Sequence, residues 1–94
     1  MAMIASFKDP DTQTLADGRR VRRFAHIEAV ALRKLRQLQI AGRLDDLRIP
    51  PGNRLELLKG RRAGQYSIRI NDQYRVCFRW TFAGPADVEI VDYH

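Results

Sequence analysis

The chain has 94 residues, of which 45% are hydrophobic and 30% charged, which excludes a disordered segment and leaves room for one domain. The formal net charge is +6, and arginine supplies 14 of the 17 basic residues, so an anionic partner is expected, nucleic acid first. No apolar run approaches the ~20 residues of a membrane span, no signal peptide is visible, and the single cysteine, Cys77, excludes an internal disulfide. We therefore expect one domain over residues 1–94, cytoplasmic and without a membrane partner. Met1-Ala2 resembles a cloning addition before a natural start at Met3.

The first part of the chain predicts a short strand and a short helix. Met3–Phe7 is apolar and typical of an edge strand. Asp9 and Pro10 indicate a helix start, with Asp as the N-cap and Pro at the first helical position, and Gly18 would end that helix. A basic connector, residues 19–23, follows.

A longer helix is predicted over His26–Ala41. Apolar residues recur there at helical spacing and predict one buried stripe, formed by Ile27, Val30, Ala31, Leu35 and Leu38. Polar residues fall on the other side, namely Arg33, Lys34, Arg36 and Gln37. Gly42 would end the helix, and Pro50–Asn53 breaks the chain before a sheet.

From Arg54 onward, apolar and polar residues alternate with period two, which predicts four strands of an antiparallel meander. One face would lie on the helices and the other toward solvent. The positions expected to face the core are Leu55 and Leu57, then Tyr66, Ile68 and Ile70, then Tyr74, Val76, Phe78 and Trp80, and finally Val88 and Ile90.

The second and third strands can be set in register from their sequence. A two-residue loop would place core Ile70 opposite polar Gln73, whereas the three-residue loop Asn71–Gln73 aligns the core positions of both strands. That register puts Arg69 directly opposite Arg75 on the solvent face. Facing like charges repel, so a bound anion would explain the pair, although chance and salt screening also permit it.

Side chains suited to RNA cleavage gather on the polar face and at one end of this sheet. Cleavage through the 2′-hydroxyl needs a base, a cation that stabilises the phosphorane and an acid. Glu56 or His94 could exchange protons, Lys59 and Arg75 could hold the phosphate, and Tyr93 could stack on an unpaired base. The alternative is a solvated charged face. No cofactor or metal is expected, because the chain has neither a ligand-spaced cluster nor a glycine-rich phosphate loop.

Two stretches of the sequence resemble a known family. Leu58–Arg75, which reads LKGRRAGQYSIRINDQYR, is similar to the middle signature of HigB-type killer toxins in the RelE/ParE superfamily. The ending Val91–His94, which reads VDYH, is similar to their C-terminus, and Met3–Phe7 resembles their first strand. The resemblance covers nearly the whole chain. It implies an α+β fold of the RelE-like microbial ribonuclease type, with an N-terminal strand and two helices packed on an antiparallel β-meander.

The resemblance also implies a toxin of a type II toxin–antitoxin system that cleaves mRNA in the ribosomal A site. Its expected partners are the ribosome, mRNA and a neutralising antitoxin with a helix-turn-helix domain. Lys59 and Arg75 match family positions tied to phosphate handling, and Asp92, Tyr93 and His94 match C-terminal active-site residues. Glu56 stands where the best-known members have a histidine, so either it replaces that base or the enzyme is weaker.

The catalytic candidates are Glu56, Lys59, Arg75, Asp92, Tyr93 and His94. The expected RNA contacts are Arg19, Arg20, Arg22, Arg23, Arg61, Arg62 and Arg69. A second hypothesis is a toxin that acts by binding, either on gyrase as ParE-type relatives do, or on the ribosome with little nuclease activity. A third is an RNA-binding module without toxicity. The terminal Asp-Tyr-His favours the ribonuclease, and the missing histidine favours the binding toxin.

Overall fold

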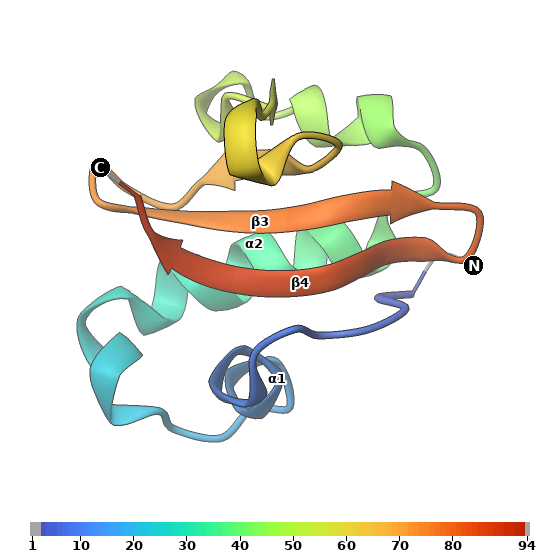
Figure 1. Ribbon diagram of the computed structural model, residues 1–94. Coiled ribbons are helices and arrows are strands. Elements are labelled where there is room, and N and C mark those ends of the chain that lie inside the picture. The colour runs from blue at the N-terminus through green and yellow to red at the C-terminus, as the bar shows by residue number, and fades with distance from the viewer. Residues whose placement is uncertain (1–2, 94) are drawn as a thin grey trace.

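The computed structural model describes residues 3–93, so both the interpretation of Met1-Ala2 and the role expected for His94 lie outside the described residues. Two helices, α1 (Pro10–Ala16) and α2 (Glu28–Ile40), pack on a sheet with the strand order β1-β2-β3-β4. The strands are β1 (Glu56–Leu57), β2 (Tyr66–Arg69), β3 (Tyr74–Thr81) and β4 (Gly84–Asp92). Short 3-10 helices connect them: η1 (Arg22–Ile27), η2 (Leu44–Arg48), η3 (Pro51–Asn53) and η4 (Gly60–Arg62). The expected α+β architecture and antiparallel meander are confirmed (Figure 1).

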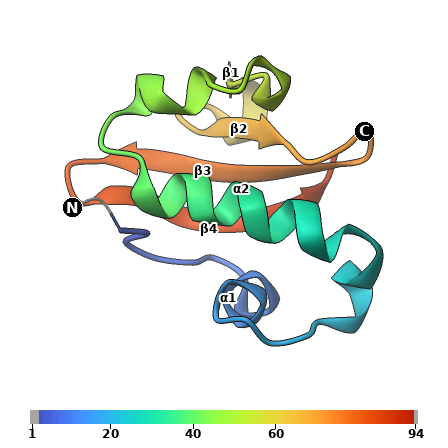
Figure 2. The same cartoon turned by 180° about the vertical axis from the view of Figure 1, so that it is seen from behind.

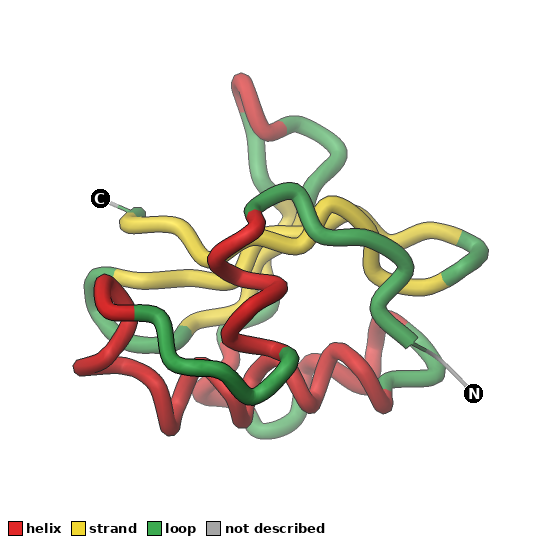
Figure 3. The backbone as a smooth tube through the Cα atoms, turned by 90° about the horizontal axis from the view of Figure 1, so that it is seen from below, coloured by secondary structure: helices red, strands yellow, loops and turns green. Residues whose placement is uncertain are grey.

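The helices cover one face of the sheet. Figure 2 shows α2 running across β3 and β4, with α1 beside it. Ile68, Val76, Phe78 and Val88 of the strands are fully buried beneath this layer. Seen from below, most helical segments lie on one side of the strands, and one short helical segment lies on the other (Figure 3). Within residues 3–93, no helix is long and apolar enough to cross a membrane.

The N-terminal segment lies along β4 but is not a regular strand, so the strand expected over Met3–Phe7 is wrong. Phe7 makes one isolated parallel bridge with Val88, and the amide of Ala5 donates to the carbonyl of Pro85 at 2.7 Å. The ladder is interrupted because Pro85 has no amide hydrogen. Asp87, with a φ of 52°, donates its amide to the Ser6 hydroxyl instead.

Helix α1 begins and ends where the sequence predicts. Asp9 is the N-cap, Pro10 is the first helical residue, and Gly18 follows the helix with a φ of 88°. Thr12 is fully buried: its hydroxyl donates to the Asp9 carboxylate at 2.8 Å and accepts from the amide of Ile90 at 3.0 Å. The first helix is therefore fixed to the last strand by a buried hydrogen bond.

Helix α2 is shorter than predicted, because the residues before Glu28 form η1. The buried stripe of Ile27, Ala31, Leu35 and Leu38 is confirmed, and Val30 is partly buried against it. Lys34 was expected on the polar side, but only 6% of it is exposed. That interpretation fails because residues of η3 cover this side of the helix, as described below.

The register of β2 and β3 is confirmed: Ile68 pairs with Val76, and Arg69 pairs with Arg75. The pattern fails at β1, which has two residues and leaves Leu57 exposed while Leu58 is buried. α1 and α2 lie against β4 and β3, whereas β1 is at the opposite edge of the sheet. At the β1 edge, the alternation of apolar and polar residues therefore does not predict which side chains are buried.

Candidate functional site

A row of polar side chains crosses the outer face of the sheet. The register pairs Glu56 with Ser67, Ser67 with Cys77, and Cys77 with Glu89, one residue from each strand. Ser67 and Cys77 are fully buried, so this face is not simply solvated as the sequence suggested. Arg62 of η4 contributes to this buried layer, with its Nη1 atom 2.9 Å from the Glu89 carboxylate.

Two pKa shifts follow from this packing. Its hydrogen bond to Glu89 raises the pKa of Arg62, which keeps the pair ionised. Burial raises the pKa of the Cys77 thiol, which keeps the sulfur protonated and unreactive. The middle of the outer face is therefore a structural layer.

Arg75 lies at one end of this face and is held by several groups. Its Nη1 atom donates to the Ser67 hydroxyl at 2.8 Å and to the Arg54 carbonyl at 3.5 Å. The Glu56 carboxylate is 3.7 Å away, and the Tyr93 ring centroid is 5.7 Å from the guanidinium carbon. Only 18% of the Arg75 side chain is exposed. The fold thus brings two predicted site residues, Glu56 and Tyr93, together around a third, the fixed cation of Arg75.

The C-terminal part of β4 is anchored to the loop between β2 and β3. The Tyr93 amide donates to the Gln73 carbonyl at 2.7 Å, and the Gln73 side-chain amide donates to the Asp92 carboxylate at 3.0 Å. Gln73 therefore presents Asp92 and Tyr93 at the rim of the sheet, as expected for a segment tied into it. The sequence predicts Gln73 only as a loop residue. The period-two pattern of the flanking strands does not indicate its contacts with Asp92 and Tyr93.

Lys59 is not brought into this group. It is exposed at the start of η4, and the structure gives its side chain no hydrogen bond or ion pair within residues 3–93. Arg61, two residues later, is also exposed. Both are therefore available to an external anion, rather than part of the hydrogen-bonded group around Arg75.

The facing arginines of β2 and β3 have different surroundings. Arg75 is fixed as described, whereas Arg69 donates to the carboxylate of Asp72 in the adjacent turn. This ion pair relieves the repulsion that the register predicts. A phosphate at Arg69 would therefore compete with Asp72 for the guanidinium.

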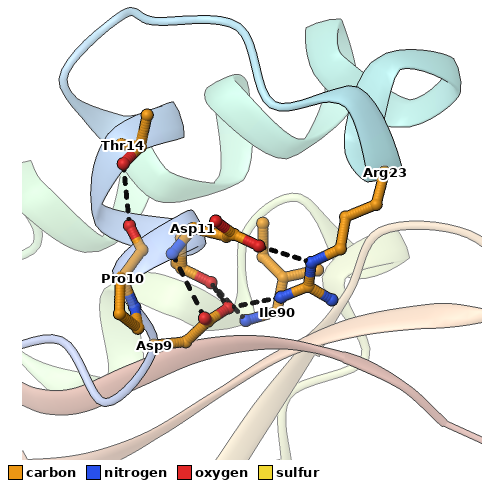
Figure 4. Close-up of polar contacts among 7 residues, drawn as sticks. Asp9, Pro10, Asp11, Thr14, Arg23 and Ile90 are labelled. Carbon is orange, nitrogen blue, oxygen red and sulfur yellow. Dashed lines mark hydrogen bonds and ion pairs between the residues drawn. The ribbon is translucent and has the colours of Figure 1, made fainter.

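The basic connector, residues 19–23, also contains both unpaired and ion-paired arginines. Arg19, Arg20 and Arg22 are exposed and have no ion-pair partner among residues 3–93. Arg23 is bound to both Asp9 and Asp11 at 2.8 Å (Figure 4). The hydrogen bond to Asp11 raises the pKa of Arg23. Arg23 therefore joins η1 to the start of α1, a role that composition alone does not reveal.

The connector lies at the same end of the sheet as Tyr93. The rings of Phe24 and His26 in η1 pack edge-on against Tyr74, with centroids 6.5 and 5.5 Å away. Tyr74 begins β3 and pairs with Asp92 of β4. The connector therefore lies near the end of the sheet that carries Asp92, on the side of the core, whereas Arg75 is on the outer face.

A buried polar network, missed by sequence reasoning, fixes the segment before β1. The Lys34 ammonium donates to the Asn53 side-chain carbonyl at 2.6 Å, and the Asn53 amide donates to Gln37 at 2.8 Å. Burial lowers the pKa of Lys34. Asn53 is fully buried and precedes Arg54, a left-handed residue whose carbonyl accepts from Arg75.

Within residues 3–93, no group of three His, Cys, Asp or Glu side chains could hold a metal ion. The geometry offers a fixed guanidinium, a nearby carboxylate and an aromatic ring at a basic rim. Such a set can orient a phosphodiester, stack a base and exchange a proton without a metal.

Comparison with known proteins gives a family match. Residues 6–94 match a family described as "RelE-like toxin of type II toxin-antitoxin system HigB". Toxin HigB-1 of Vibrio cholerae is 54% identical over 54 residues, which are 57% of this chain and 57% of that protein. An uncharacterized protein of Haemophilus influenzae is 39% identical over 56 residues, which are 60% of this chain and 55% of that protein. The matches span little more than half the length of these relatives.

Proposed function

The chain belongs to the HigB-like family of RelE-like toxins of type II toxin–antitoxin systems, and from this premise we propose that it is a ribosome-dependent endoribonuclease that cleaves mRNA in the A site. The observation that carries the proposal is the placement of Arg75 between Ser67, Glu56 and Tyr93. Its guanidinium has a fixed direction, which is what stabilising a developing phosphorane requires.

The proposed reaction is a transesterification without metal or cofactor. The 2′-oxygen bonds to the adjacent phosphorus, the bond from phosphorus to the 5′-oxygen breaks, and a 2′,3′-cyclic phosphate forms. A base takes the proton of the 2′-hydroxyl, and an acid protonates the leaving 5′-oxygen. Glu56 is the proposed base, because its carboxylate lies 3.7 Å from Arg75 and would adjoin a phosphate bound there. His94 is the proposed acid.

The remaining site residues bind and orient the RNA. Tyr93 offers a ring beside the guanidinium on which an unpaired base can stack. Asp92, bound to Gln73, positions that end of β4. Lys59 and Arg61 are exposed cations that would bind neighbouring phosphates.

The proposed RNA-binding surface extends from this site along the basic connector. Arg19, Arg20 and Arg22 are exposed for phosphate contact. Arg23, Arg62 and Arg69 already contact carboxylates, so they would contribute only by sharing or exchanging these partners. We further infer that the chain acts in the cytoplasm, where ribosomes and mRNA are found, and that its antitoxin carries a helix-turn-helix domain.

One observation favours a second candidate function, a toxin that acts by binding. Lys59 stands apart from the Arg75 group, and the family resemblance implies a histidine where this chain has Glu56. A chain with a weak catalytic set would still bind the ribosome, or another target such as gyrase, through its basic surface.

Mapping mRNA 5′ ends by primer extension after induction separates these functions. The nuclease predicts new ends inside translated codons, which also appear with purified ribosomes programmed with mRNA. They should vanish with Arg75→Ala. Gyrase-linked DNA breaks, or growth arrest without any new ends, would replace the proposal with the binding toxin.

A further inference from the structure

A second surface, which RNA cleavage leaves unused, lies at the tip of the β3–β4 hairpin. Phe82 is fully exposed there, Ile40 at the end of α2 is 72% exposed, and Met3 is largely exposed. Together with Trp80 they line one open hollow of about 920 Å³. We call it the hairpin hollow. Contiguous exposed apolar side chains of this kind often mark protein interaction sites.

Hydrogen bonds hold the turn at the hairpin hollow in one conformation. The Thr81 hydroxyl donates to the Gly84 carbonyl at 2.6 Å and accepts from the Ala83 amide at 3.2 Å, which fixes the turn that carries Phe82. Gly84 has a φ of 111°, and a Cβ atom there would clash with the carbonyl oxygen of Met3. Glycine therefore lets the N-terminal segment approach the hairpin and complete the hollow.

The hairpin hollow lies far from the Arg75 group. β3 runs from Tyr74, beside the candidate site, to Thr81 at the hairpin. At about 3.3 Å per residue, these two ends are roughly 23 Å apart. Figure 1 shows the hairpin and the C-terminal end at opposite sides of the molecule. A molecule seated on the hollow would not need to touch the proposed RNA site.

Charge around the hollow indicates what would bind. Arg36 lines it, and Arg33 and Arg36 line the adjoining groove between α1 and α2. Asp17 also lines that groove, but neither arginine has an ion-pair partner among residues 3–93. An apolar centre with unpaired arginines at its margin fits a protein segment that carries a large apolar side chain flanked by carboxylates.

We propose that the hairpin hollow is the docking surface for the cognate antitoxin, which would bind it through an acidic amphipathic segment. The proposal rests on family membership, because a type II system includes an antitoxin, and it does not depend on the nuclease. A second copy of this chain is disfavoured, since a two-fold symmetric contact presents the same patch from both chains and brings their arginines together. RNA is disfavoured by the apolar centre.

The test uses Phe82→Glu and Ile40→Glu, with Ile49→Glu as the matched control. Ile49 is an equally exposed isoleucine that does not line the hollow. Binding of each purified toxin to the purified antitoxin from the same operon is measured by calorimetry, and growth is followed with toxin alone and with both proteins. Both hollow variants should bind at least tenfold more weakly. They should arrest growth alone as the parent does and escape rescue by the antitoxin, whereas Ile49→Glu behaves like the parent.

Three results would overturn the proposal. The first is parental affinity of both hollow variants for the antitoxin. The second is a change of oligomeric state: if the parent is a dimer by light scattering, and the variants are monomers that bind the antitoxin as the parent does, the hollow binds a second copy of the chain. The third is loss of growth arrest by folded variants, which would assign it to the toxin's target. Neither calorimetry nor growth arrest depends on how the toxin acts. This test therefore remains valid if the nuclease proposal fails.

Discussion

The Nη1 atom of Arg75 donates a 2.8 Å hydrogen bond to the hydroxyl of Ser67, a fully buried side chain on the neighbouring strand. The arginine that best fits phosphate binding is therefore oriented by the interior of the sheet rather than left to solvent. Preorganised donors of this type stabilise transition-state charge without reorganising during the reaction.

The first prediction is that Arg75→Ala lowers mRNA cleavage by about 10²–10³-fold, the usual loss when one preorganised donor is removed. Arg75→Lys should recover little, because an ammonium is not a planar fork that can reach several acceptors. Both variants are tested by mRNA cleavage on programmed ribosomes and by growth after induction. Arg79→Ala is the control, since Arg79 is exposed on the same strand and pairs with Asp87. Growth arrest by a well-folded Arg75→Ala toxin would sink the assignment.

A second prediction separates the free and paired arginines of the connector. Replacing Arg19, Arg20 and Arg22 by glutamine should weaken RNA binding and reduce its salt slope by about 0.7 per lost phosphate contact, with stability unchanged. Arg23→Gln should instead lower the free energy of unfolding by about 0.5–1 kcal/mol, because it breaks two partly exposed ion pairs. Binding titrations at several salt concentrations and urea unfolding test the two halves. An unchanged slope in the triple variant would remove the connector from the footprint.

The third prediction concerns Lys34 and pH. Its ordinary pKa is 10.5, and burial lowers the pKa in the folded state, with Arg33 and Arg69 adding to the effect. Between these two pKa values the unfolded chain binds more protons at this residue, so the free energy of unfolding rises with pH. Lys34→Met removes this contribution. The stability of the parent relative to Lys34→Met should therefore increase as pH rises toward the ordinary pKa of 10.5.

Urea unfolding of both proteins across this range checks the sign, and Arg36→Met, at an exposed position of the same helix, is the control. A difference between parent and Lys34→Met that stays constant or falls with pH would contradict the assignment of the lowered pKa to Lys34.

The fourth prediction is that Gly84→Ala lowers the free energy of unfolding by about 1–3 kcal/mol. Its φ of 111° strains any side chain, and the added Cβ would meet the backbone of Met3. Gly52→Ala is the control, because a Cβ atom there meets nothing within 4 Å. Thermal or urea unfolding of the two variants decides the matter. Equal stability would mean that the N-terminal segment does not rest on the hairpin.

The fifth prediction tests the proposed acid, which lies outside the described residues. Deleting His94, or changing it to glutamine, should slow cleavage on the ribosome and alter its pH profile, because neither variant can donate an imidazolium proton. Stability should hardly change. If both variants cleave at the parental rate with the parental pH profile, another group protonates the leaving oxygen.

Local patterns predicted much of this fold. The Asp9-Pro10 helix start and the stripe of Ile27, Ala31, Leu35 and Leu38 depend on neighbours close in sequence, and the β2–β3 register follows from period two. The polar face of the strands and the chemistry of RNA cleavage predicted Glu56, Arg75 and Tyr93, of which Arg75 and Tyr93 also match the family resemblance, and the fold brings the three together.

The remaining features depend on partners far along the chain. Lys34 is buried because Asn53, 19 residues later, covers it. Arg62 contacts Glu89 across 27 residues, and Arg23 contacts Asp9 across 14. A basic residue that binds RNA and one that holds two elements together look alike in sequence. Only the placement of the carboxylates distinguishes them.

The hydrogen bond between Thr12 and Ile90 joins residues 78 positions apart, and the first extended segment has its partners in the same last strand. The first helix therefore has no complete packing partner until β4 has been synthesised and has left the ribosome. Asp92 and Tyr93 of the site belong to that final stretch as well. A chain that lacks β4 consequently lacks both a closed core and the Asp92 and Tyr93 of the candidate site.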